Sequence, residues 1–207
     1  KSYEQKEGKE APPRLFDLTA IQVECNKKFA FSAEQTLNYV QKLYEKKLVT
    51  YPRVDTTYLP DDIYPKIPGI LKGLKYYSKL TEPLLQDKIR KSTKVFNNKK
   101  VTDHHAIIPT GVNPSGVTPQ EQQVYDTITK RFISVFYPDC KVSNTTVIGD
   151  VDGIEFKATG KQIIEPGWRV VYGGEASSDD ERDQIFLITG ILFLVFLIGS
   201  IIKYNVI

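Results

Sequence analysis

A tyrosine, an arginine and an aspartate alternate along one short proline-containing segment of this chain. They are Tyr51, Arg53 and Asp55, in the run Thr50-Tyr51-Pro52-Arg53-Val54-Asp55. A phenol is a weak nucleophile at neutral pH because its ordinary pKa is about 10. It becomes useful when a fixed cation lies beside the group that it attacks, and a phosphate is the natural target of such a pair. The spacing therefore indicates chemistry on a phosphodiester.

A second polar block contains both histidines of the chain, in the run Asp103-His104-His105-Ala106-Ile107-Ile108-Pro109-Thr110. Neighbouring side chains on an extended segment point in opposite directions, so His104 and His105 are not expected to serve the same group. Together with the tyrosine segment, this block favours strand-cleaving chemistry on nucleic acid.

The formal net charge of +3 is too weak to indicate a nucleic-acid partner by itself, but the charges are unevenly distributed. Between residues 88 and 100 there are cations and no carboxylate. Such a stretch is able to bind several phosphates by releasing their counterions, and the alternative is an ordinary solvated loop. The candidate DNA-binding residues are Lys88, Arg90, Lys91, Lys94, Lys99 and Lys100.

Cys25 and Cys140 are too few and too far apart for a metal site or a disulfide framework. We expect two buried thiols in a reducing compartment, which favours a cytoplasmic protein. The chain begins with Lys1 and contains no methionine, so we expect a fragment of a longer protein. Residues 1–14 contain no apolar run that would indicate a signal peptide.

The helix signals are concentrated before the tyrosine and after the basic stretch. We expect helices over about 18–28 and 32–47, two helical pieces within 60–86, and a helix from about 119. Ser32 with Gln35, and Thr118 with Glu121, have the spacing of capping boxes. The second helix leads directly to Tyr51, so the tyrosine is expected to lie on a packed support.

The remaining segments indicate other structure. The charged residues 1–13 end in two prolines and are typical of a linker or of the tail of a preceding element, while 88–100 is expected to form a loop. Residues 145–149 and 154–158 flank Asp152-Gly153 and predict a β-hairpin. The sequence thus predicts a mainly α protein with a β-rich C-terminal piece.

Residues 185–202 form an uncharged apolar run of the length needed for a transmembrane helix. Two origins are open, a genuine C-terminal anchor or an out-of-frame reading at the broken end of a gene. We favour the second, because the resemblance described next ends near this run, and membrane attachment is therefore not expected.

The ordered set of motifs resembles the type IA DNA topoisomerases, in particular the topoisomerase III-like branch. The resemblance extends from about residue 12 to 173. It is carried by the blocks Leu15-Phe16-Asp17-Leu18-Thr19, Phe31-Ser32-Ala33, Leu43-Tyr44-Glu45, Thr50 to Asp55, Asp103 to Thr110, and Glu165-Pro166-Gly167-Trp168.

This resemblance implies a role for each candidate residue. Tyr51 matches the tyrosine that attacks single-stranded DNA and becomes joined to a 5′ phosphate, in a reaction that needs no ATP. Arg53 matches an arginine that contacts the scissile phosphate, and His104 a histidine near the same phosphate. Asp55 is expected to hold the arginine and the tyrosine in place. Trp168 is expected to be a packing residue.

The resemblance also implies a domain plan and partners. Residues 14–137 match a helical, winged-helix-like domain that carries the tyrosine, 138–173 match a strand-rich part of the arch, and 174–207 form a divergent tail. The family binds Mg²⁺ in a Toprim domain that this chain lacks, so no bound metal is expected here. The expected partners are single-stranded DNA and the rest of the topoisomerase chain, in a bacterial cytoplasm at the nucleoid.

Three other functions are compatible with parts of the pattern. A relaxase or replication-initiator nuclease also uses tyrosine and histidines, but it needs two metal-binding histidines that face the same way. A DNA-binding module without catalytic activity would use only the basic stretch. A tail-anchored membrane protein would derive its attachment from the apolar run.

Overall fold

The computed structural model of the chain describes residues 2–151 and 154–173. They belong to two compact units: unit 1 contains the described residues up to 11 and from 139 onward, and unit 2 contains residues 12–138. The apolar run at 185–202 and its two proposed origins lie outside the described residues. Within the described residues, no helix is long and apolar enough to cross a membrane.

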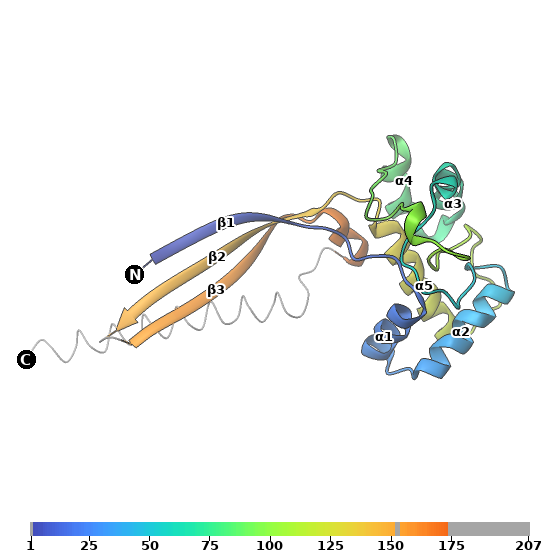
Figure 1. Cartoon of the computed structure of the whole chain (residues 1–207), viewed down its shortest axis with the longest axis horizontal. Helices are drawn as coiled ribbons and strands as arrows, with labels where there is room; N and C mark the ends of the chain where they lie inside the picture. Colours follow the sequence, from blue (N-terminus) through green and yellow to red (C-terminus); the bar gives the residue numbers. More distant parts are fainter. Residues whose placement is uncertain (1, 152–153, 174–207) are drawn as a thin grey trace, which may run out of the picture. The chain divides into compact units, whose positions relative to one another are not determined.

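Unit 1 contains an antiparallel sheet of three strands in the order β1-β2-β3. These strands are β1 (Ser2–Glu10), β2 (Cys140–Val151) and β3 (Ile154–Glu165). Figure 1 shows them side by side. The pairing of β2 with β3 confirms the predicted hairpin, although both strands are longer than the apolar runs that indicated them.

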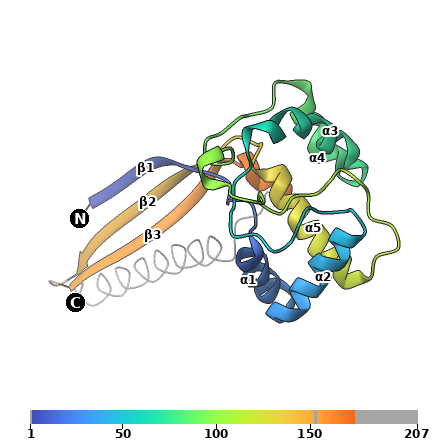
Figure 2. The same cartoon turned by 45° about the vertical axis from the view of Figure 1, so that its right-hand side comes forward.

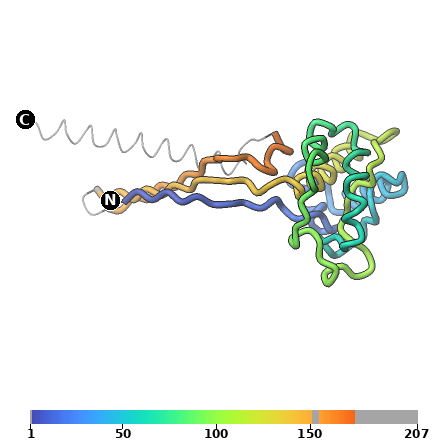
Figure 3. The backbone as a smooth tube through the Cα atoms, turned by 90° about the horizontal axis from the view of Figure 1, so that it is seen from above, coloured from blue at the N-terminus to red at the C-terminus, as the bar shows by residue number. Residues whose placement is uncertain are grey.

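The N-terminal segment was predicted as a linker over residues 1–13, and here the structure differs. Residues 2–10 form β1, which pairs with β2 from Ser2 opposite Ile148 to Glu10 opposite Cys140 (Figure 3). Its side chains are polar and mostly exposed, so the alternation of apolar and polar residues that signals a strand is missing. Backbone hydrogen bonds to a segment far along the chain hold it in place.

The carboxylate of Glu10 fastens the end of β1 to the rest of unit 1. Its two oxygens pair with Lys161 Nζ at 2.8 Å and with an Arg169 nitrogen at 2.7 Å. Trp168, in the 3₁₀ segment η4 (Gly167–Tyr172), donates its ring N–H to the Glu10 carbonyl at 2.9 Å. Trp168 therefore packs within unit 1, and the structure gives it the predicted structural role.

Unit 2 is helical, and long irregular segments connect its helices (Figure 2). The elements of unit 2 are α1 (Leu18–Phe29), α2 (Ala33–Glu45), η1 (Asp61–Lys66), α3 (Ile67–Gly73), η2 (Lys75–Tyr77), α4 (Ser78–Gln86), η3 (Asn98–Lys100) and α5 (Pro119–Ser134). Helix α2 packs against both α1 and α5, and α3 packs against α4.

Both predicted capping boxes are present. In α2 the Ser32 hydroxyl accepts from the Gln35 N–H while the Gln35 side chain accepts from the Ser32 N–H. Thr118 and Glu121 make the same reciprocal pair at the start of α5. These caps satisfy backbone donors that a helix start leaves without partners, and each contributes about 1 kcal/mol.

Glu121 has a second role, because its side chain is almost fully buried with a lysine as its partner. Lys46, at the end of α2, donates to the Glu121 carboxylate at 2.7 Å and to the Gly116 carbonyl at 2.9 Å. Burial raises the pKa of Glu121, but the hydrogen bonds from Lys46 and Thr118 and the Lys46 charge lower it more, so it lies below the ordinary 4.5. The ion pair joins the end of α2, just before the tyrosine segment, to α5.

The Lys46→Met variant tests this ion pair. At neutral pH, we expect the free energy of unfolding to fall by about 1–3 kcal/mol, because a buried carboxylate loses a hydrogen-bond donor. A lowered carboxyl pKa stabilises the fold above pH 4.5, and that stability is lost as the pH falls through the lowered value. The difference between variant and wild type should therefore shrink in acid, as measured by urea unfolding at several pH values. Lys79→Met, at an exposed position on α4, is the control; equal loss in both variants, or a loss independent of pH, would contradict this role.

Candidate active site

The tyrosine segment leaves α2 as an extended chain whose side chains alternate between the interior and solvent. Pro52 and Val54 are buried, Arg53 and Asp55 are exposed, and Tyr51 is half-buried. Successive side chains of an extended chain point to opposite sides. The apolar residues therefore anchor the segment, and the polar residues between them stay accessible.

Hydrogen bonds join this segment to the histidine block, more than fifty residues further along the chain. The Thr50 N–H donates to the Ile108 carbonyl at 2.9 Å, and the Ile108 N–H donates to the Thr50 hydroxyl oxygen at 3.0 Å. The Thr110 N–H donates to the Leu48 carbonyl at 3.0 Å. Tyr51 and the histidine block are thus held beside each other by backbone on both sides.

Further hydrogen bonds connect both segments to the rest of unit 2. The Ile107 N–H donates to the Phe16 carbonyl at 2.8 Å, and the Ala106 N–H donates to the Tyr58 carbonyl at 3.0 Å. The Leu18 N–H, at the start of α1, donates to the Val54 carbonyl at 3.1 Å. Ala106, Ile107 and Ile108 are buried, so these bonds are shielded from water.

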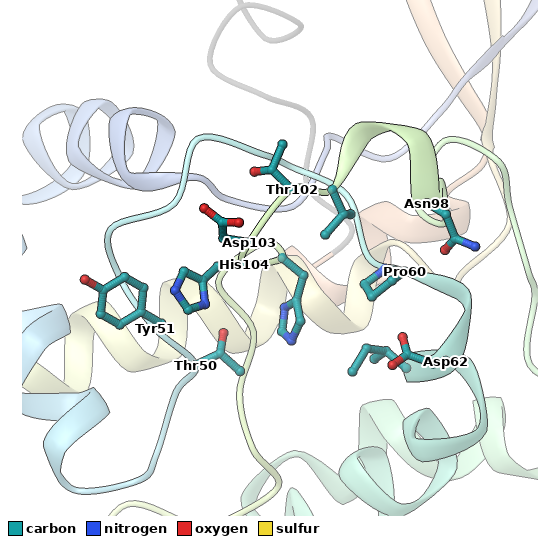
Figure 4. Close-up of a pocket in the computed structure, with 11 residues that line it drawn as sticks. Thr50, Tyr51, Pro60, Asp62, Asn98, Thr102, Asp103 and His104 are labelled. Carbon is teal, nitrogen blue, oxygen red and sulfur yellow. The ribbon is translucent and has the colours of Figure 1, made fainter.

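The ring of Tyr51 lies between two other rings. The centroids of Tyr51 and His104 are 4.5 Å apart, and those of Tyr51 and Tyr44 are 5.5 Å apart in an edge-to-face arrangement. Figure 4 shows the imidazole of His104 beside the Tyr51 ring. Tyr44 projects from the last turn of α2, which was predicted to support the tyrosine. These contacts restrict the Tyr51 side chain without burying it.

Two open cavities flank His104. Tyr51 lines one with a volume of about 520 Å³, and Arg53 lines the other, with a volume of about 500 Å³. His104, Thr102 and Asp103 line both. Because both cavities lie at residues that could act on a phosphodiester, the region between them is the candidate active site.

Comparison with known proteins decides the family. The model of the DNA topoisomerase family matches residues 1–190. The chain belongs to this family. The match extends beyond the region of resemblance, residues 12–173, at both ends, so β1 and part of the predicted divergent tail lie within it.

Curated relatives and a solved structure agree with this assignment. The chain is 41% identical over 187 residues to DNA topoisomerase 3 of Bacillus anthracis, covering 88% of this chain and 26% of that protein. It is 40% identical over 177 residues to DNA topoisomerase 3 of Bacillus subtilis (strain 168), covering 83% and 24%. The fold is similar to full-length topoisomerase I from Thermotoga maritima, with a TM-score of 0.61, 22% identity, and coverage of 84% and 29%. The predicted resemblance to type IA topoisomerases is confirmed, and the chain spans about a quarter of its curated relatives.

Asp55 of this topoisomerase chain forms no hydrogen bond or ion pair with Arg53, Tyr51 or any other described residue. Its expected role in holding the arginine and the tyrosine in place stays a prediction. Arg53 is also unpaired within the described part of the chain and lies on the other cavity from Tyr51. The guanidinium is therefore available to a ligand.

The two histidines of the topoisomerase chain both line the cavity beside Tyr51, but they have different surroundings. His104 is exposed beside Tyr51, while His105 is half-buried with its Nδ1 2.8 Å from the Ala106 carbonyl oxygen. In the part of the chain that the structure describes, no group of three or more His, Cys, Asp or Glu side chains is placed to hold a metal ion.

Half of the predicted DNA-binding cations make contacts within the protein. Arg90 donates to the Tyr137 carbonyl at 3.0 Å, Lys91 pairs with Asp61 at 2.5 Å, and Lys100 donates to the Tyr58 hydroxyl oxygen at 3.1 Å. The side chains that make no hydrogen bond or ion pair with the described residues are those of Lys88, Lys94 and Lys99. All six residues are exposed.

Sequence reasoning did not assign site roles to Tyr44, Thr50 and Asp103. Tyr44 lies in the helix expected over about 32–47, and nothing local in the sequence shows that its ring contacts Tyr51. Thr50 precedes the tyrosine and bonds to a block that is distant in sequence. The signal that was available is the occurrence of all three residues inside the motif blocks of the family.

The Thr50→Val variant tests the bonds between the tyrosine segment and the histidine block. Valine keeps the shape but removes the acceptor for the buried Ile108 N–H, so we expect the free energy of unfolding to fall by about 1–3 kcal/mol. Hydrogen exchange of the Ile108 amide should also become faster. Thr57→Val is the control, because the Thr57 side chain makes no hydrogen bond within the described residues. Unchanged stability and unchanged exchange in Thr50→Val would show that these bonds do not hold the site together.

Proposed function

We propose that Tyr51 is the nucleophile with which a type IA DNA topoisomerase cleaves and rejoins single DNA strands, changing DNA topology without ATP. The observation that carries this proposal is the position of Tyr51 on an open cavity between Tyr44 and His104, in a chain of the DNA topoisomerase family. Nucleophile and histidine lie side by side on a rigid support, as a positioned attack requires.

The chemistry exchanges one phosphodiester for another. The Tyr51 oxygen attacks a phosphorus of the DNA strand and gives up its proton. The bond from phosphorus to the 3′ oxygen breaks, and the released 3′ oxygen takes up a proton. The product is a 5′-phosphotyrosine and a free 3′ hydroxyl. Because the new bond resembles the old one in energy, the reverse attack by the 3′ hydroxyl reseals the strand without another energy source.

Arg53 and His104 supply the charge and hydrogen bonds that this reaction needs. The guanidinium of Arg53 is exposed and has no partner among the described residues, so it is available to a phosphate on its own cavity, and His104 borders both cavities. A scissile phosphate near His104 would lie between the nucleophile and the cation. Donors aimed at the developing charge commonly contribute on the order of 10²–10³ in rate.

Parts outside this chain complete the proposal. Mg²⁺ would be held by the Toprim domain of the whole enzyme, as the resemblance to the family implies. Single-stranded DNA and that domain are the proposed partners, and a bacterial cytoplasm at the nucleoid is the proposed location. The winged-helix-like character of residues 14–137 and the assignment of residues 138–173 to the arch also remain predictions.

The Tyr51→Phe variant tests the nucleophile. We mix this chain with a purified Toprim-containing part of a Bacillus DNA topoisomerase 3, add Mg²⁺ and end-labelled single-stranded DNA, and measure the covalent adduct on a denaturing gel. Tyr51→Phe should abolish the adduct because it removes the attacking oxygen, whereas Tyr44→Phe, the control, should retain it because the packing ring is kept. The chain alone should neither form an adduct nor relax supercoiled DNA. An undiminished adduct in Tyr51→Phe would reject Tyr51 as nucleophile, and DNA binding without any adduct would favour a non-catalytic binding module.

The unpaired lysines should bind the DNA backbone. In Lys88→Gln/Lys94→Gln/Lys99→Gln, we expect the slope of log affinity against log salt to fall by about 2, since each phosphate contact on a single strand contributes about 0.7. The measurement is fluorescence anisotropy of a labelled oligonucleotide at several salt concentrations. A control on α3, α4 and η1, at equally exposed lysines, is Lys66→Gln/Lys72→Gln/Lys79→Gln. Equal slopes for the two triple variants would contradict a specific role for the basic stretch.

A further inference from the structure

The cavity beside Tyr51 extends well beyond the reacting atoms. In Figure 4, Tyr51 and His104 lie at one end, while Pro60, Asp62 and Asn98 lie at the other. Its volume of about 520 Å³ falls in the range of small-molecule sites, about 300–1,000 Å³. The cavity therefore has room for a group of nucleotide size next to the nucleophile.

The far end offers one hydrogen-bond donor and one acceptor without partners. The Asn98 side-chain oxygen accepts from the Asp61 N–H at 2.7 Å, which leaves the two N–H groups of its amide nitrogen directed elsewhere. The Asp62 carboxylate makes no hydrogen bond or ion pair with the residues that the structure describes. Its neighbour Asp61 is paired with Lys91. Both residues line the far end of one cavity, and an amide donor together with a carboxylate acceptor suits the edge of a nucleobase, where N–H donors and acceptors alternate.

The charge and the walls at the far end of the cavity disfavour the sugar–phosphate backbone there. Asp62 lies at that end, and a carboxylate repels a phosphate. Pro60, Ile63 and Val101 supply apolar surface, against which the face of a base packs favourably. Lys99 follows Asn98 in the sequence, is exposed, and makes no side-chain hydrogen bond or ion pair with the described residues. It is therefore available to a DNA phosphate outside the cavity.

We propose that this cavity binds one unstacked base of the DNA strand, with Asn98 and Asp62 contacting the base edge. The proposal rests on the proposed function, because the strand is brought here by Tyr51. Seating a base fixes the register of the strand, and thereby selects which phosphate lies within reach of the Tyr51 oxygen. Asn98 and Asp62 then act as positioning residues for strand cleavage.

The test is an abasic scan of a labelled single-stranded hexamer, with binding to the full chain measured by fluorescence anisotropy at low salt. An abasic site at one position should weaken binding about 5- to 100-fold, the range that seating one base covers. Asn98→Asp keeps the acceptor for the Asp61 N–H, removes the amide donor and adds a negative charge. Asp62→Asn removes the negative charge and replaces one acceptor oxygen with an N–H donor. In each variant the abasic site at that position should cost less, because the intact base has lost a contact.

Matched controls carry the same chemical changes elsewhere. Asn38→Asp on α2 and Glu82→Gln on α4 alter charge at exposed positions and should leave the scan unchanged. Equal binding of every abasic hexamer, or absence of hexamer binding, would overturn the base site. So would an unchanged scan in both cavity variants. None of these results would affect the Tyr51 adduct, so the base site and the proposed function can fail separately.

Discussion

The arrangement depends on the hydrogen bonds that hold the buried segment Ala106–Ile108 between three other parts of the chain. Its backbone bonds to Phe16 on one side, to Thr50 on another and to Tyr58 on a third. None of these segments forms a long strand, so each bond is an isolated bridge or a single loop contact. Loss of one of these bonds would leave a buried donor or acceptor without a partner, which costs free energy, so the irregular backbone is held in one conformation. These hydrogen bonds therefore set the positions of Tyr51 and His104.

The same backbone places the phenol of Tyr51 and the guanidinium of Arg53 on two different cavities. Tyr51 is half-buried and Arg53 is exposed on one short extended segment, and they line different cavities that meet at His104. A phosphate attacked by the phenol and contacted by the guanidinium must therefore lie along this shared border. This constraint separates the phosphate from the far end of the cavity beside Tyr51, which carries carboxylates and apolar surface.

The parts of the fold that could be predicted from the sequence are those set by local chemistry. Ser32 with Gln35 marked the start of α2, because both partners of a capping box lie within one turn. The strand β1 was missed because its pairing lies entirely in the backbone and its partner is far away in sequence. The contact of Lys100 with Tyr58 was also beyond reach, since a cation in a charge-rich stretch gives no sign of a distant tyrosine. Residue types and spacing thus indicated the chemistry, while the separation of Arg53 from Tyr51 needed coordinates.

The most direct test of the central claim is the location of the DNA on the protein. The covalent adduct is trapped, the DNA is trimmed with nuclease, and the protein is digested with trypsin and analysed by mass spectrometry. Cleavage after Lys47 and Arg53 releases residues 48–53, in which Tyr51 is the one tyrosine. The account predicts a nucleotide joined through its 5′ phosphate to Tyr51 in this peptide. A nucleotide on any other residue, or one joined through its 3′ phosphate, would contradict it.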